Sequence, residues 1–299
     1  MQKKSLLCTI SLLLFNLAVM AEDGSKLWMR HKPYNTAKVT IHSKSATAEI
    51  AKKELEQYYD GKSVALNIDK SLPTNGSYVI SGTQNDKKIS AGSDIGLLYG
   101  AYALLRNDMT QGVNQPAFGL RILNHWDNLD SSIERGYAGP SIFWNKEMRL
   151  DTARIHEYAR ANASIGINGT VLNNVNASPK MLSRPYLLKV KQIADILRPY
   201  GIRVYLSVNF ASPMRLGGLR TADPLNTGVR QWWKKKAKEI YREVPDFGGF
   251  LVKANSEGQP GPGDYGRSHS DGANMLPLDE VKHLLQNLVI LREAVNSLH

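Results

Sequence analysis

Apolar and polar segments alternate regularly along the second part of the chain, from about residue 119 onward. Four short apolar runs indicate buried strands, and each is followed by a longer stretch with the period of an amphipathic helix. The strands begin near residues 119, 170, 202 and 248, and the predicted helices are "RLDTARIHEYARANASIG", "PYLLKVKQIADILRPYG", "GVRQWWKKKAKEIYREVP" and "PLDEVKHLLQNLVILREAVNSLH". Strands separated by one helix each are typical of a parallel sheet in the α/β class.

Residues 24 to about 118 predict a smaller α/β unit in front of this region. "KVTIHS" and "SYVISGT" have the composition of strands, and "ATAEIAKKELEQYYDG" and "DIGLLYGAYALLRND" have the pattern of helices. Gly61 is expected to end the first of these helices as a C′ glycine.

Each of the four later strands becomes polar where it ends: "NHWDN", "NNVNA", "SVNFAS" and "KANSEG". A single asparagine there would be a turn former or a helix cap, but four polar strand ends in succession favour a shared site. In parallel α/β proteins, ligands bind at the carboxyl ends of the strands. We therefore expect Glu257 to lie in a cleft with Lys253, Asn209, Asn174 and the residues around Trp126.

The end of the last strand adds a second argument for a site. Lys253, Asn255 and Glu257 are spaced by two residues, so in a continuing strand their side chains would point the same way. Because burying an unpaired carboxylate is costly, Glu257 should have either partners or a chemical purpose.

The first 21 residues have the pattern of a secretory signal peptide. "MQKK" is a positive n-region, "SLLCTISLLLFNLAVM" is an apolar h-region, and "VMA" is a small-residue cleavage site. The apolar run is short for a membrane span, which disfavours the alternative of an uncleaved anchor. Cleavage after Ala21 would also remove Cys8, the only cysteine. We expect a periplasmic or extracellular protein without disulfides, divided into segments 1–21, 22–118 and 119–299.

The net charge of +11 is high but is spread along the chain. The densest cluster, "KKKAK" at residues 234–238, lies in a helical pattern and is expected to be a solvated helix face. No nucleic-acid-binding motif accompanies it, so a DNA-binding role is the least favoured function. The sequence also has no GxGxxG after a strand, no Walker motif and no HExxH. We expect no metal and no cofactor.

Four long segments resemble the α-glucuronidases of glycoside hydrolase family 67. They are "NHWDNLDSSIERGYAGPSIFW" (124–144), "SIGINGTVLNNVNA" (164–177), "VYLSVNFASPMRLGGLRTADPL" (204–225) and "DFGGFLVKANSEGQPGPGDYGRSHSDGANML" (246–276). The resemblance implies an N-terminal accessory α/β domain followed by the first half of a catalytic (β/α)8 barrel. The implied reaction is removal of α-1,2-linked glucuronic acid, or its 4-O-methyl ether, from xylooligosaccharides with inversion. The implied partners are glucuronoxylan-derived oligosaccharides, and the full-length form is a candidate homodimer.

The resemblance also assigns roles to individual residues. The family's general acid corresponds to Glu257, and the lysine that helps hold the sugar carboxylate corresponds to Lys253. Trp126 would line the sugar pocket, and Val175 would lie near the 4-O-methyl group. The sequence departs from the family at Asn255, where aspartate is common, so one negative charge beside the acid is missing.

An inverting glycosidase needs a general base as well as an acid. Within the chain Asp127, Glu134 and Asp264 are candidates, but each has a plainer interpretation. Asp127 would bind a hydroxyl group. Glu134 and Arg135 would each pair with neighbours of the other and so shape the pocket. Asp264 lies in a loop. A closed barrel needs eight βα units and only four are recognisable, so the family's base is expected outside this chain.

Three hypotheses of function follow from these observations. The first is a family 67 α-glucuronidase that is truncated and lacks its general base. The second is a carbohydrate-binding remnant of such an enzyme without catalysis. The third, a different glycosidase on a similar barrel, is disfavoured by the specific "NHWDN…SIERGYAG" segment.

Overall fold

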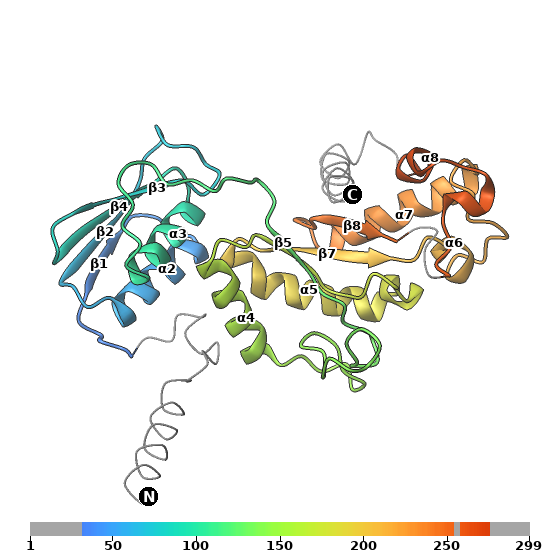
Figure 1. Cartoon of the computed structure of the whole chain (residues 1–299), viewed down its shortest axis with the longest axis horizontal. Helices are drawn as coiled ribbons and strands as arrows, with labels where there is room; N and C mark the ends of the chain where they lie inside the picture. Colours follow the sequence, from blue (N-terminus) through green and yellow to red (C-terminus); the bar gives the residue numbers. More distant parts are fainter. Residues whose placement is uncertain (1–31, 254–257, 276–299) are drawn as a thin grey trace, which may run out of the picture.

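The computed structural model describes residues 32–253 and 258–275. The signal-peptide prediction, Asn255, Glu257 and the last predicted helix fall outside the described residues. Two four-stranded sheets form the framework, one built from the first part of the chain and one from the second (Figure 1).

The first sheet has the strand order β1-β2-β4-β3. Its strands are β1 Lys38–Ile41, β2 Ser63–Ile68, β3 Tyr78–Gly82 and β4 Asp86–Ala91. β2 runs parallel to both β1 and β4, whereas β3 runs antiparallel to β4. Helices α2 (Ala46–Tyr58) and α3 (Asp94–Leu105) pack against each other between this sheet and the second part of the chain (Figure 1).

The sequence predicted β1, β3 and both helices of this unit, but it missed β2 and β4. The prediction that Gly61 ends the first helix as a C′ glycine was wrong. α2 ends at Tyr58, and its cap residue Tyr59 is extended with its N–H donating to the Leu55 carbonyl. Glycine is needed at position 61 for space, because a Cβ there would lie 2.4 Å from the Tyr59 ring.

The second sheet has the order β5-β6-β7-β8, and every neighbouring pair is parallel. The strands are β5 Ile122–Asn124, β6 Gly169–Val171, β7 Arg203–Val208 and β8 Gly249–Val252. The helices between them are α4 Thr152–Ser164, α5 Arg184–Leu197, the short α6 Ser212–Arg215, and α7 Thr227–Glu243. A short helix α8, His269–Ala273, follows β8, and 3-10 turns η1 (Pro179–Leu182), η2 (Arg198–Tyr200) and η3 (Pro262–Tyr265) lie in the connections. This confirms the predicted parallel α/β sheet, with one long helix between successive strands and the additional short α6 between β7 and β8.

Polar side chains fix where α4 and α7 begin. Asp151 accepts a hydrogen bond from the Arg154 amide at the start of α4, and Asn226 accepts one from the Val229 amide at the start of α7. Such caps satisfy amide groups that have no partner within the helix, and each contributes about 1 kcal/mol.

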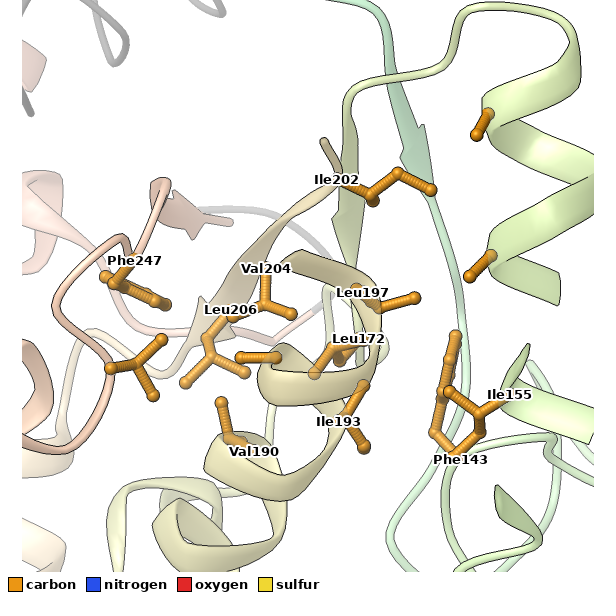
Figure 2. Packing of buried hydrophobic residues seen from close by; sticks show 14 of the residues in the cluster. Phe143, Ile155, Leu172, Val190, Ile193, Leu197, Ile202, Val204, Leu206 and Phe247 are labelled. Atoms are coloured by element: carbon orange, nitrogen blue, oxygen red, sulfur yellow. The ribbon is translucent and has the colours of Figure 1, made fainter. Parts of the chain in front are cut away.

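The second sheet and its helices share a hydrophobic core (Figure 2). Its buried side chains include Leu172 after β6, Val204 and Leu206 of β7, and Val190, Ile193 and Leu197 of α5. These apolar positions recur along α5 at the spacing of one helix face, which is why the sequence pattern located this helix correctly.

One buried ion pair links the two parts of the chain. Arg160 on α4 donates from both Nε and Nη2 to the two carboxylate oxygens of Glu54 on α2, at 2.6 and 2.8 Å. Tyr102 on α3 adds a longer contact to Glu54 at 3.4 Å, and the Arg160 guanidinium lies over the Tyr58 ring. The second part of the chain is therefore anchored to the helix layer of the first.

Within residues 32–253 and 258–275, no helix is long and apolar enough to cross a membrane.

Candidate functional site

The carboxyl ends of the four parallel strands meet at one edge of the second sheet. Asn124 pairs with Val171, Val171 pairs with Tyr205, and Val208 pairs with Val252. The residues that follow these strands are therefore neighbours in space although they are far apart in the sequence. The last of them, Lys253, is the final described residue of this strand end.

A pocket of about 380 Å³ opens at this edge. Most of the residues that line it have polar side chains; the lining consists of Asp127, Asn128, Leu129, Asp130, Asn173, Asn174, Asn176, Ala177, Ser178, Lys180 and Tyr186. Amide side chains dominate, and amides can both donate to and accept from a polyhydroxylated ligand. Two of the predicted site residues, Asp127 and Asn174, line this pocket directly.

Trp126 and its neighbours alternate between solvent and interior. The Trp126 side chain is 38% exposed, whereas Asp127 is buried. The Asp127 carboxylate accepts from the Ser141 hydroxyl and the Ile142 amide through Oδ1, and its Oδ2 lies 3.7 Å from His125 Nδ1. The Asp127 side chain is thus held in place in the interior, and Trp126 beside it points out of the core.

His125 lies in an apolar and aromatic environment. Its ring makes edge contacts with Phe143 and packs at a tilt against Tyr158, with ring centroids 5.2 and 5.4 Å away. Burial lowers the pKa of the His125 imidazole, and the nearby Asp127 carboxylate opposes this only in part. The ring is therefore neutral at neutral pH.

Asn173 and Asn174 are both buried but do different things. Asn173 bridges strands, because its side chain accepts from the Ser207 amide and donates to the Ser207 carbonyl. Asn174 donates to Asn128 Oδ1, and its own Oδ1 accepts from the Asn176 amide. Only Asn174 was a predicted site residue, although both line the pocket.

Lys253 and Asn209 lie at the rim of the pocket. Lys253 Nζ donates to Asn176 Oδ1 at 2.9 Å, and Asn209 Nδ2 donates to the Ala177 carbonyl at 3.2 Å. Asn209 also donates to Gln259 Oε1 at 3.0 Å. The structure therefore brings Lys253, Asn174 and Asn209 to the same edge.

Glu134 and Arg135 are held in the loop that returns beside Trp126. The Glu134 amide donates to the Trp126 carbonyl, and its backbone has a φ of 54°, which is unusual for a residue other than glycine. Glu134 Oε1 is 3.3 Å from Arg135 Nε, while Oε2 is buried without a hydrogen bond. Neither residue lines the 380 Å³ pocket, and neither does the partly exposed Val175.

The sequence profile of the glycosyl hydrolase family 67 middle domain matches residues 105–297. The chain belongs to glycosyl hydrolase family 67. Membership makes it a glycoside hydrolase by descent, and it confirms the resemblance found in the four strand-end segments.

Curated relatives agree with this family. A probable alpha-glucuronidase A from Aspergillus fumigatus is 49% identical over 191 residues, covering 61% of this chain and 23% of the relative. Alpha-glucuronidase A from Emericella nidulans is 38% identical over 317 residues, covering 88% of this chain and 37% of the relative. This family 67 chain therefore spans roughly a quarter to two fifths of the length of these relatives.

Solved structures support the fold alone. A beta-N-acetylhexosaminidase from Bacteroides fragilis superposes with a TM-score of 0.51 at 13% identity, covering 87% of this chain and 61% of that chain. A glycoside hydrolase family 138 enzyme that targets pectin rhamnogalacturonan II superposes with a TM-score of 0.50 at 16% identity, covering 73% of this chain and 30% of that chain.

The pocket of this family 67 chain contains residues that the sequence analysis did not single out. They are Asn128, Asp130, Asn173, Asn176, Ser178, Lys180 and Tyr186. Asn176 and Ser178 lie in or just after the "NNVNA" strand end, so the same polar-tip argument could have included them. Tyr186 comes from the start of α5, and no local pattern distinguishes it from an ordinary helix residue.

Proposed function

We propose that this chain is the acid-bearing part of an α-glucuronidase. The reaction is inverting hydrolysis of α-1,2-linked glucuronic acid, or its 4-O-methyl ether, from xylooligosaccharides. The observation that carries the proposal is the amide-lined pocket at the carboxyl edge of the second sheet, with Lys180 in its lining and Lys253 bonded to Asn176. Relatives at 38–49% identity bear the name alpha-glucuronidase.

The pocket has the chemistry that a uronic acid requires. A glucuronate carries one carboxylate and several hydroxyl groups. Lys180 lines the pocket and Lys253 reaches Asn176 at its rim, so two ammonium groups stand where a carboxylate can be bound. The neighbouring amides of Asn174 and Asn176 can bind the hydroxyl groups.

We infer that β5–β8 are the first half of a (β/α)8 barrel and that the first sheet with α2 and α3 is an accessory domain. Four parallel strands in sequence order, each followed by a helical segment, match the way such a barrel begins. The site then lies on the face where barrel enzymes carry their active sites.

The general base is best sought outside these four βα units. Asp127 is buried and already accepts two hydrogen bonds, Glu134 Oε2 is shielded from solvent, and Asp264 accepts from the Gly261 amide. Neither Asp127 nor Glu134 is placed to activate a water molecule on an open sugar face, and the exposed Asp264 lines a different pocket, beside Gln259 and Tyr265. Glu257, the proposed acid, lies outside the described residues.

The proposal predicts that the pocket selects a sugar acid over a neutral sugar. Replacing Lys253 with methionine keeps the aliphatic stem but removes the cation, and should weaken glucuronate binding by about 10–100-fold, the value of a charge-assisted hydrogen bond. Binding of glucose should change little. Calorimetric titration of each sugar into the protein checks this.

Lys235→Met is the matched control, because Lys235 is an exposed lysine on α7. It should leave both affinities unchanged. Equal affinity of the wild-type protein for glucuronate and glucose would refute the uronate site. Binding of aldouronic oligosaccharides by the full gene product without release of glucuronate would favour the alternative, a non-catalytic carbohydrate-binding remnant.

We also propose that the protein is exported. The charged start, the apolar run and the "VMA" site predict cleavage after Ala21. N-terminal sequencing of the mature protein should begin at Glu22. A product that keeps Met1, or one found only in the cytoplasm, would contradict export.

A further inference from the structure

A chain of hydrogen-bonded, largely buried polar groups begins at His125, the residue before Trp126. His125 Nε2 is 2.7 Å from the Tyr158 hydroxyl, which is in turn 2.9 Å from Thr170 Oγ1. Tyr158 comes from α4 and Thr170 from the buried strand β6. The chain therefore ties the residue next to Trp126 to a helix and to a neighbouring strand.

The direction of these hydrogen bonds follows from their ends. The Asp127 carboxylate, 3.7 Å from Nδ1, favours the tautomer of His125 that carries its proton on Nδ1. Nε2 of that neutral ring can only accept, so the Tyr158 hydroxyl donates to it. Having a single hydrogen, Tyr158 must accept from Thr170. Each hydrogen bond then has one defined direction, which fixes the orientation of the imidazole ring.

The backbone around Trp126 is held as well. The His125 amide donates to the Val171 carbonyl, and the Asn174 amide donates to the Asp127 carbonyl. Both residues flanking Trp126 are thus bonded to the end of β6 or to the segment that follows it, and their side chains are mostly buried. Trp126, at 38% exposure, is the residue of this segment that projects outward.

The helix that supplies Tyr158 is itself anchored. Arg160, two residues further along α4, forms the bidentate ion pair with Glu54 of α2. Tyr158 also stacks edge-on against Phe143, with ring centroids 5.4 Å apart. The support behind His125 is therefore rigid on two sides, which a positioning role requires.

We propose that His125 and Tyr158 are positioning residues that set the orientation of Trp126 for a pyranose ring. This rests on the proposed function and on the role that the family resemblance implies for Trp126, that it lines the sugar pocket, since Trp126 is not among the residues lining the 380 Å³ pocket. Tyr158 acts through His125, and neither needs to touch the sugar. A ring held in one orientation binds a flat sugar face better than one that must be ordered during binding.

The test separates this role from ordinary core packing. Tyr158→Phe keeps the ring contacts and removes only the hydroxyl. In protein labelled with 5-fluorotryptophan, the Trp126 resonance, assigned with Trp126→Phe, should shift or broaden in Tyr158→Phe. Glucuronate affinity should fall by about tenfold, since small displacements of a binding group are costly. Tyr241→Phe on α7 is the control, and it should leave the Trp126 resonance and the affinity unchanged.

Changes at His125 provide a second comparison. His125→Gln keeps an oxygen acceptor within reach of Tyr158 and should restore much of the wild-type resonance, whereas His125→Leu should resemble Tyr158→Phe. A wild-type Trp126 resonance and affinity in both Tyr158→Phe and His125→Leu would overturn the inference. If wild-type protein and Trp126→Phe bind glucuronate equally, the proposed contact with the sugar fails, while a shifted Trp126 resonance still supports the positioning role.

Discussion

Replacing Glu54 with alanine should lower the free energy of unfolding by about 3–5 kcal/mol, the cost of breaking a buried ion pair from one side. The Glu54 side chain is only 9% exposed and Arg160 is 25% exposed, so the remaining guanidinium would stay largely desolvated without its carboxylate. Because the pair joins α2 to α4, the loss should affect both sheets together. Urea unfolding followed by circular dichroism measures this change.

Glu56→Ala provides a matched control on the same helix. Glu56 pairs with Lys52 at 3.7 Å, and both side chains are about a third or more exposed. Its removal should cost less than about 0.5 kcal/mol. The double variant Glu54→Leu/Arg160→Met should recover much of the stability, because no buried charge is then left unpaired. Equal losses for Glu54→Ala and Glu56→Ala would show that the ion pair does not stabilise the contact between the two parts.

The long helices could be predicted because their signal is local. In α5, the apolar residues Leu187, Val190, Ile193, Ala194 and Leu197 are all buried, and they recur at the spacing of one helix face. α7 follows the same rule: of its "KKKAK" lysines, Lys235 and Lys238 are exposed, while Lys234 and Lys236 are partly buried. A helix needs no distant partner to show which face is buried.

The two missed strands of the first sheet show where such reasoning stops. β4, "DKKISA", is mostly polar, and only Ile89 and Ala91 are fully buried. It is nevertheless an internal strand, paired with β2 on one side and β3 on the other. That position depends on non-local pairing, which a six-residue pattern does not encode.

The sequence predicted which edge of the sheet carries the candidate site, but it did not predict the contacts that individual side chains make there. Polar strand ends indicated the correct edge, and Lys253 and Asn209 both reach residues that line the pocket there. The sequence could not separate Asn173 from Asn174, since the bridge from Asn173 to Ser207 depends on a strand 34 residues away. The roles of these residues in binding sugar stay predictions.

Replacing Glu257 with alanine in the full gene product should reduce the rate of hydrolysis of xylooligosaccharide substrates far more than the rate of hydrolysis of an activated aryl glucuronide. A xylose hydroxyl is a poor leaving group and needs a proton as the bond breaks, whereas an activated phenol leaves with little help. General acid catalysis typically accounts for about 10²–10⁴-fold in rate. We expect a loss in that range on the oligosaccharide and a loss below about tenfold on the aryl substrate, measured as kcat for both.

The competing explanation is that Glu257 only balances the charge of Lys253. In that case its removal would disturb the binding of the sugar carboxylate, which both substrates share, and both would lose activity equally. Lys253→Met supplies the reference pattern, because losing the cation should weaken the binding of both substrates and raise the KM for each. If Glu257→Ala followed this pattern, the role of Glu257 would be substrate binding. The general acid would then have to be sought on another strand. A loss confined to the poor leaving group requires a proton donor at Glu257, because charge balance alone does not distinguish one leaving group from another.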